Sequence, residues 1–150
     1  MTAETDVRAL YAALIGAWNR RDAAGMAECF ADAGQMVGFD GSQVDGRAEI
    51  AAHLAPIFRD HPTPAFVTRI RSVRLPAEDV AVLRAEVGMA PSGQTELNPA
   101  LNAVQSLVAV RRPNGWRVEL FQNTPAAFHG RPEAAEAFTA GLRAVLAAQA

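Results

Sequence analysis

The chain has 150 residues, half of them hydrophobic, and a formal net charge of −2 at pH 7. This length and apolar content predict one compact domain, residues 1–150, large enough to enclose a small cavity. The balanced charge and the scattered arginines argue against nucleic-acid binding. No apolar run is long enough to cross a membrane, and the N-terminus is acidic where a signal peptide would be basic, so we expect a cytoplasmic protein without membrane contact.

Several residue types that cofactor chemistry requires are absent or isolated. All 14 basic residues are arginine, which excludes a lysine Schiff base and covalently held pyridoxal phosphate. The three histidines are too scattered for a metal site, and no glycine pattern matches a phosphate-binding loop. The single cysteine, Cys29, falls on the apolar side of a short predicted helix, where a thiol is usually inert packing. We therefore expect no metal and no cofactor.

The chain begins with a predicted helix whose apolar face carries two aromatic side chains. Tyr11 and Trp18 lie two helical turns apart and share this face. The face consists of Val7, Leu10, Tyr11, Leu14 and Trp18. Both aromatic residues are candidates for lining a cavity, and plain core packing is the alternative.

Two further helices and a strand follow. Asp22 is placed to cap a short helix that extends through Phe30, and a strand is expected over roughly Gln35 to Phe39. A third helix, near Arg47 to Arg59, places His53 among its apolar residues. Burial there would lower the pKa of the imidazole and keep it neutral, the form that accepts a proton, while a purely structural histidine is an equal alternative.

The second half of the chain is predicted to form an antiparallel meander and a closing helix. Strands are expected at about 65–75, 79–90, 100–112 and 115–124, separated by Leu75-Pro76, Pro91-Ser92-Gly93 and Pro113-Asn114-Gly115. In the second of these strands Val80 and Val82 share a face with Arg84 and Glu86, and the other face is apolar throughout. We therefore expect helices on one face of the sheet and a second copy of the chain on part of the other. An amphipathic helix follows Pro132.

Amide side chains occur in pairs on the last two strands. Regular alternation puts Trp116, Val118, Leu120 and Gln122 on one side of the final strand and Arg117, Glu119, Phe121 and Asn123 on the other. Asn102 and Gln105 are divided in the same way on the strand before it. A buried amide without a partner costs roughly 1–3 kcal/mol. We expect one amide of each pair to face the pocket and the other to face the subunit contact or the loop at 125–131; one bulge would reverse the assignment.

The predicted element order is typical of an α+β roll in which a curved, mostly antiparallel sheet wraps around N-terminal helices. AWNRRDAAGMAECFADAG and DGRAEIAAHLAPIF resemble the nuclear-transport-factor-like superfamily, the cone-shaped, cystatin-like fold shared with SnoaL-like polyketide cyclases and ketosteroid isomerases. VGFDGS, LNPALNAVQSLVAV and LFQNTPAAFHGRPEAAEAF resemble the SgcJ/EcaC group, found in enediyne polyketide gene clusters and often labelled oxidoreductases. The resemblance implies a homodimer with an internal apolar pocket for a polycyclic or polyene molecule.

The catalytic residues of the ketosteroid isomerases do not carry over to this sequence. Their aspartate base falls at Gly38, and their oxyanion tyrosine falls at Leu14, one turn from Tyr11. Asp40 is the nearest substitute base, with an ordinary turn role as the alternative. The catalytic candidates are His53, Asp40 and Tyr11. The substrate-binding candidates are Trp18, Phe30, Met89, Asn102, Gln105, Phe121, Gln122 and Asn123.

Two functions fit these candidates. The first is a cofactor-independent enzyme that cyclises, isomerises, hydrates or oxidises a hydrophobic polyketide or polyene intermediate, with His53 or Asp40 moving a proton and the amides holding an oxygen. The second is a non-catalytic protein that binds or carries such an intermediate in the same pocket.

Overall fold

The computed structural model describes residues 2–91 and 95–149. The expected turn at Ser92-Gly93 lies outside the described residues. The elements are α1 (Ala3–Asn19), α2 (Ala23–Glu28), β1 (Phe30–Val37), β2 (Gln43–Asp45), α3 (Arg47–Asp60), β3 (Ala65–Ala77), β4 (Val80–Ala90), η1 (Pro99–Leu101), β5 (Ala103–Arg112), β6 (Gly115–Pro125) and α4 (Pro132–Ala148). Within the described part of the chain, no helix is long and apolar enough to cross a membrane.

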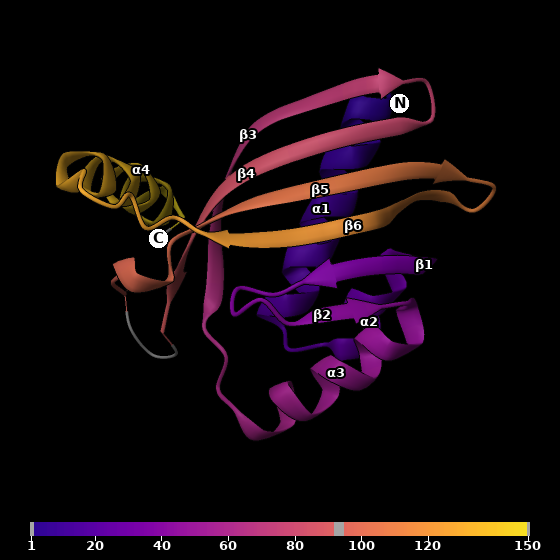
Figure 1. Cartoon of the computed structure of the whole chain (residues 1–150), viewed down its shortest axis with the longest axis horizontal. Helices are drawn as coiled ribbons and strands as arrows, with labels where there is room; N and C mark the ends of the chain where they lie inside the picture. The colour runs from indigo at the N-terminus through magenta and orange to yellow at the C-terminus, as the bar shows by residue number, and fades with distance from the viewer. Residues whose placement is uncertain (1, 92–94, 150) are drawn as a thin grey trace.

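One six-stranded sheet, in the order β2-β1-β6-β5-β4-β3, forms the centre of the fold. Its neighbouring strands are antiparallel except for β1 and β6, which are parallel. Figure 1 shows the long strands curving across α1, with α2 and α3 beside the short strands β1 and β2 and α4 set apart at one end of the sheet. The α+β cone predicted from the sequence is confirmed.

The first strand begins earlier than predicted. β1 starts at Phe30 rather than Gln35 and ends at Val37, and α2 ends at Glu28 instead of continuing through Phe30. The cause is pairing with a distant strand: the Val118 backbone N–H donates to Cys29 O at 2.8 Å, and Phe30 pairs with Val118. A tertiary contact thus overrides the local pattern, in which small and polar residues after Phe30 indicate a break.

A bulge in β6 changes which side chains face the helices. Val108 pairs with Leu120, but the next residue of β5, Ala109, pairs with Val118, so Glu119 is the extra residue. The predicted face with Trp116, Val118, Leu120 and Gln122 together is therefore wrong. The inner face, which packs against the N-terminal helices, instead carries Trp116, Val118, Phe121 and Asn123. A single inserted residue reverses the alternation of everything that follows it.

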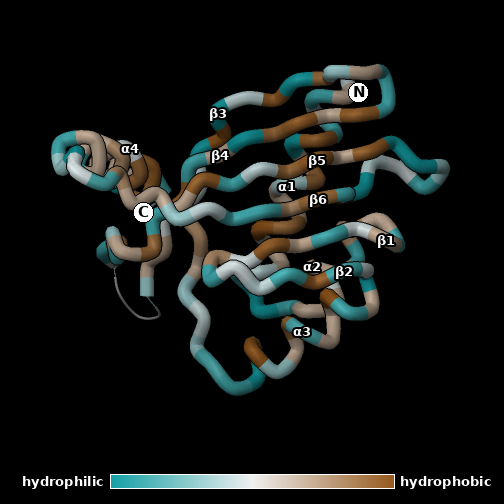
Figure 2. Tube along the Cα trace, viewed as in Figure 1, coloured by the Kyte–Doolittle hydropathy of each residue, from teal (hydrophilic) through white to brown (hydrophobic). Residues whose placement is uncertain are grey.

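The two faces of the sheet are covered differently. The main core fills the space between the inner face and helices α1, α2 and α3, with Tyr11, Phe30 and Leu107 among its fully buried side chains. A smaller cluster on the outer face joins Val67, Leu97, Phe138 and Leu142, the last two from α4. Figure 2 shows hydrophobic residues along the long strands and hydrophilic ones at the end of the β5–β6 hairpin. The protein's own last helix therefore covers one end of the face where the sequence indicated a second subunit.

Gly34 sets how closely β1 approaches β6. A Cβ atom on this residue would lie 2.6 Å from the Val118 backbone oxygen, which is too close for any side chain. We predict that Gly34→Ala lowers the free energy of unfolding by about 1–3 kcal/mol, because backbone must move to relieve the contact. Gly16→Ala is the control, since its new methyl meets only the end of the Arg20 side chain and the helix gains roughly 0.5–1 kcal/mol from losing a glycine. Equal effects of the two substitutions in urea unfolding would contradict the prediction.

Candidate functional site

A cavity of about 390 Å³ lies between the inner face of the sheet and helices α1, α2 and α3. Most of its wall is apolar, and few of its side chains can ionise or form hydrogen bonds. The lining residues are Trp18, Met26, Met36, Gly38, Phe39, Asp40, His53, Leu54, Ile57, Thr63, Pro64, Phe66, Met89, Leu101, Ala103, Phe121 and Asn123.

Trp18 forms a fixed aromatic part of the wall. Its indole Nε1 donates to the Pro64 carbonyl oxygen at 2.9 Å, so its polar edge is already paired. The ring packs edge-on against Phe58 with centroids 5.1 Å apart, and against Phe66 at 5.2 Å. Edge-to-face packing of this kind holds a ring in one orientation. Trp18 therefore offers the cavity an apolar surface rather than a hydrogen bond.

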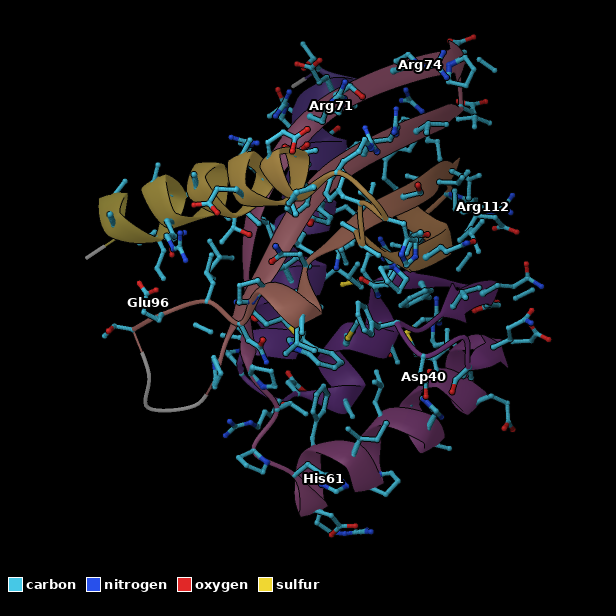
Figure 3. All side chains as sticks on the ribbon, turned by 60° about the vertical axis from the view of Figure 1, so that its left-hand side comes forward. Asp40, His61, Arg71, Arg74, Glu96 and Arg112 are labelled. Atoms are coloured by element: carbon cyan, nitrogen blue, oxygen red, sulfur yellow. The ribbon has the colours of Figure 1, made fainter. Side chains whose placement is uncertain are left out.

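Asp40 and His53 supply the ionisable groups of the cavity wall. Asp40 lies exposed in the turn between β1 and β2, and Figure 3 shows it on the side of the molecule occupied by α3, the helix that carries His53. The Asp40 Oδ1 accepts from the Ser42 N–H at 2.9 Å, an ordinary turn contact. Hydrogen bonds from Ser42, and more weakly the nearby His53, lower the pKa of Asp40. Asp40 is therefore ionised at neutral pH, and His53 is half-buried rather than fully buried as expected.

A chain of buried hydrogen bonds ends at the cavity. The Tyr11 hydroxyl donates to Gln105 Oε1 at 2.6 Å, and Gln105 Nε2 donates to Asn123 Oδ1 at 2.8 Å. Tyr11 and Gln105 are buried behind the wall, and Asn123 lines it. The register of the sheet explains the last contact, because Gln105 of β5 and Asn123 of β6 are directly paired on the inner face.

A model of the SnoaL-like domain family matches residues 7–123. The chain belongs to the SnoaL-like domain family. No functionally curated protein matches it.

Solved structures with the same fold carry varied names. A domain of unknown function with a cystatin-like fold from Nostoc punctiforme is 25% identical, with a TM-score of 0.80, and the match covers 93% of this chain and 88% of that one. A ketosteroid isomerase-like protein from Erwinia carotovora is 17% identical, with a TM-score of 0.65, over 85% and 99% of the two chains. A protein from Streptomyces avermitilis, provisionally named a dehydratase of the NTF2-like family, is 21% identical, with a TM-score of 0.62, over 84% and 99%. The latter two share the fold with this SnoaL-like domain.

The structure of this SnoaL-like domain brings six of the sequence-predicted site residues to one cavity. They are Trp18, Asp40, His53, Met89, Phe121 and Asn123. Both amide pairs are split between the faces of the sheet, with Gln105 and Asn123 on the inner one. The bulge at Glu119 is the reason that Asn123, rather than Gln122, reaches the cavity.

The other five predicted site residues lie outside the wall of this cavity. Tyr11, Phe30 and Gln105 are buried in the main core, because the first helix packs directly on the centre of the sheet. Asn102 and Gln122 lie toward the outer face, where Asn102 Nδ2 donates to the Thr139 hydroxyl of α4 at 2.8 Å. In this SnoaL-like domain Tyr11 is connected to the cavity residue Asn123 through Gln105.

Sequence reasoning missed several residues of the wall of this SnoaL-like domain. Two methionines, an isoleucine and the segment after α3 supply much of the apolar surface: Met26, Met36, Ile57, Thr63 and Pro64. The helical spacing of Ile57 after His53 carried a signal, since both lie on one face of α3. The loop residues carried none, because their placement depends on Trp18 and Arg21, which hydrogen-bond Pro64 and Thr63.

Tyr11 provides a direct measure of core burial, because it is the only tyrosine of the chain. Burial raises the pKa of its phenol above the ordinary value of 10.0, against a smaller opposing effect of the Thr68 hydroxyl. We predict that ultraviolet titration of the folded protein shows no tyrosinate until the chain unfolds in alkali. Because the unfolded chain loses this proton near its ordinary pKa and the folded chain does not, stability falls as the pH rises above that value. The stability of Tyr11→Phe should fall less steeply with rising pH. If Tyr11 in the folded protein loses its proton near the ordinary pKa of 10.0, it is not buried as described.

Proposed function

We propose that this SnoaL-like domain binds a hydrophobic small molecule, such as a polyketide or polyene intermediate of the enediyne type, and moves a proton on it to isomerise or cyclise it. The main observation behind this proposal is that Asp40, His53 and Asn123 line the same, largely apolar cavity. Its volume of about 390 Å³ falls in the range of pockets that enclose drug-sized ligands. Burial of apolar ligand surface, worth roughly 25 cal/mol per Å², supplies the affinity.

His53 is the proton-transfer group in this proposal. An imidazole changes charge within the physiological pH range, and His53 sits half-buried on the cavity wall. Asp40 lines the same cavity but is a weak base, because hydrogen bonds from Ser42 lower its pKa. Removing a proton from one carbon and returning it to another requires no oxidant or reductant. The names of the isomerase-like and dehydratase neighbours agree with proton-transfer chemistry of this kind.

The alternative is a carrier that binds the same molecule without changing it. The observation that favours it is the placement of Asp40, which is exposed and engaged in a turn contact with Ser42 rather than held in the interior. A carrier uses the apolar wall and needs no acid–base group.

Proton exchange on an apolar ketone separates the two functions. The ketone β-tetralone has acidic C–H bonds on a bicyclic apolar body, and its binding is followed by Trp18 fluorescence in a Trp116→Phe background. We predict that the protein accelerates hydrogen–deuterium exchange of bound β-tetralone and that His53→Gln reduces the acceleration by roughly 10²–10⁴-fold while the Kd changes by only a few fold.

Asp40→Asn is the matched control for this experiment. It keeps the turn contact to Ser42 and removes only the charge, so the loss of exchange should be smaller than for His53→Gln. Binding of β-tetralone without accelerated exchange in the unmodified protein would support the carrier instead. A lower melting temperature of His53→Gln with exchange reduced only in proportion to the folded fraction would assign His53 to the core.

We further propose that the protein is a homodimer that pairs through the uncovered part of the outer sheet face. Five half-buried apolar side chains lie there on three adjacent strands: Val80, Val82, Val108, Val110 and Leu120. The charges beside them are partly paired within the chain, since Glu86 forms ion pairs with Arg69 and Arg71. An apolar face of this kind is typical of a contact between identical subunits.

Sedimentation tests this assembly. We expect a dimer mass at micromolar protein concentration and a monomer mass for Val108→Glu, because the new charge would be buried unpaired in the contact. Val104→Glu is not a suitable control, since Val104 packs against the α4 cluster. Ala52→Glu is suitable, because Ala52 is exposed on α3 and away from the outer sheet face, and this variant should stay dimeric. A monomer mass of the unmodified protein would refute the proposal.

A further inference from the structure

The hydrogen-bond chain from Tyr11 to Asn123 determines which end of the Asn123 amide, oxygen or nitrogen, is left free. Each primary amide has an oxygen that only accepts and a nitrogen that only donates. Gln105 receives the Tyr11 hydroxyl on its oxygen, so its nitrogen is left to donate to Asn123 Oδ1. Gln105 uses one lone pair of Asn123 Oδ1 and fixes the amide so that its nitrogen points the other way. Both N–H bonds of that nitrogen remain for a further partner, and no acceptor for them lies within hydrogen-bonding distance among residues 2–91 and 95–149.

We propose that Asn123 is a fixed hydrogen-bond donor that selects ligands carrying a carbonyl or enolate oxygen on an apolar body, and that Tyr11 and Gln105 are the residues that position it. This inference rests on the proposed function of the cavity and names the polar group that its ligand must carry. The indole N–H of Trp18, by contrast, is already committed to the Pro64 carbonyl oxygen.

The direction of the chain originates at Tyr11. The opposite arrangement, with both amides turned over, requires the Tyr11 oxygen to accept a hydrogen bond from Gln105. In the structure the Tyr11 hydroxyl instead donates to Gln105 Oε1 at 2.6 Å. Because Gln105 is fully buried, no water competes for this contact.

The position of Asn123 relates the ligand oxygen to the proton-transfer group. Val37, the last residue of β1, pairs with Gln122, so Asn123 lies beside Gly38, where the turn leading to Asp40 begins. Asn123 and His53 line the same cavity, and in this proposal the C–H bonds next to a carbonyl held by Asn123 face His53. When His53 takes that proton, the C–H electron pair forms a carbon–carbon double bond and the carbonyl π pair moves onto oxygen, where the Asn123 N–H groups stabilise the charge. In a ligand with a second carbon–carbon double bond conjugated to this enolate, return of the proton to the far carbon of that bond shifts the double bond and completes an isomerisation.

Two probes of the same shape test the donor. They are β-tetralone and its hydrocarbon analogue, in which an exocyclic CH₂ group replaces the oxygen. We expect the unmodified protein to bind the ketone about three- to tenfold more tightly than the hydrocarbon, the worth of one hydrogen bond. Asn123→Leu should bind both probes equally and keep the affinity for the hydrocarbon. Infrared spectroscopy should show a lower carbonyl stretching frequency for the ketone bound to the unmodified protein than to Asn123→Leu.

Tyr11→Phe tests the positioning role. Loss of its hydroxyl lets both amides turn, so the preference for the ketone should fall while hydrocarbon binding, which also reports correct folding, stays the same. Gln122→Leu is the matched control, because it makes a similar change on the opposite face of β6 and should keep the full preference.

Each other outcome overturns a defined part of this inference. Equal binding of both probes by the unmodified protein would refute the donor at Asn123 and leave the apolar cavity intact. Full ketone preference in Tyr11→Phe would refute the positioning role of Tyr11. If neither probe binds to any of these proteins, both the proposed function and this inference are refuted.

Discussion

The side chain of Gln105 is fully buried, and its need for hydrogen-bond partners connects the first helix to the cavity. A buried amide without partners costs roughly 1–3 kcal/mol for each unpaired group, and the surrounding core is apolar. Tyr11 on one side and Asn123 on the other satisfy both of its ends. One residue therefore hydrogen-bonds both α1 and the amide that faces the cavity.

The bulge at Glu119 lets a single strand serve two purposes. Before the bulge, β6 turns Trp116 and Val118 into the core, and after it the strand turns Phe121 and Asn123 toward the helices and the cavity. A regular strand would have presented Gln122 on the inner face in place of Asn123. Gln122 lies directly opposite Ser106 on the outer face, where it has no connection to Gln105. The oriented donor exists because of this irregularity, and bulges beside binding sites commonly redirect side chains in this way.

The fold could be read from the sequence because its signals are local and periodic. The aromatic stripe of α1, the apolar face of α3 and the turns between the long strands each predict one element, and their order indicates the cone. The early start of β1 and the bulge of β6 could not be read, because both result from pairing between strands distant in the sequence. The site was predictable only in part. The helical patterns place Trp18 and His53 in the cavity, but the same pattern predicts a direct role for Tyr11 that its burial against the sheet prevents.

The Asn123 N–H donor affects ligand specificity and catalysis in different ways. A fixed N–H donor facing an apolar space loses its contact with water when a ligand fills the cavity, so a hydrocarbon that offers no acceptor is penalised whether or not a reaction follows. Catalysis requires more than this, because only interactions that strengthen in the transition state accelerate a reaction. The donor meets that condition for enolate formation, since a hydrogen bond to a charged oxygen is roughly twice as strong as one to a neutral carbonyl. Asn123 alone would make a selective carrier, whereas the proposed enzyme requires Asn123 together with a proton acceptor at His53.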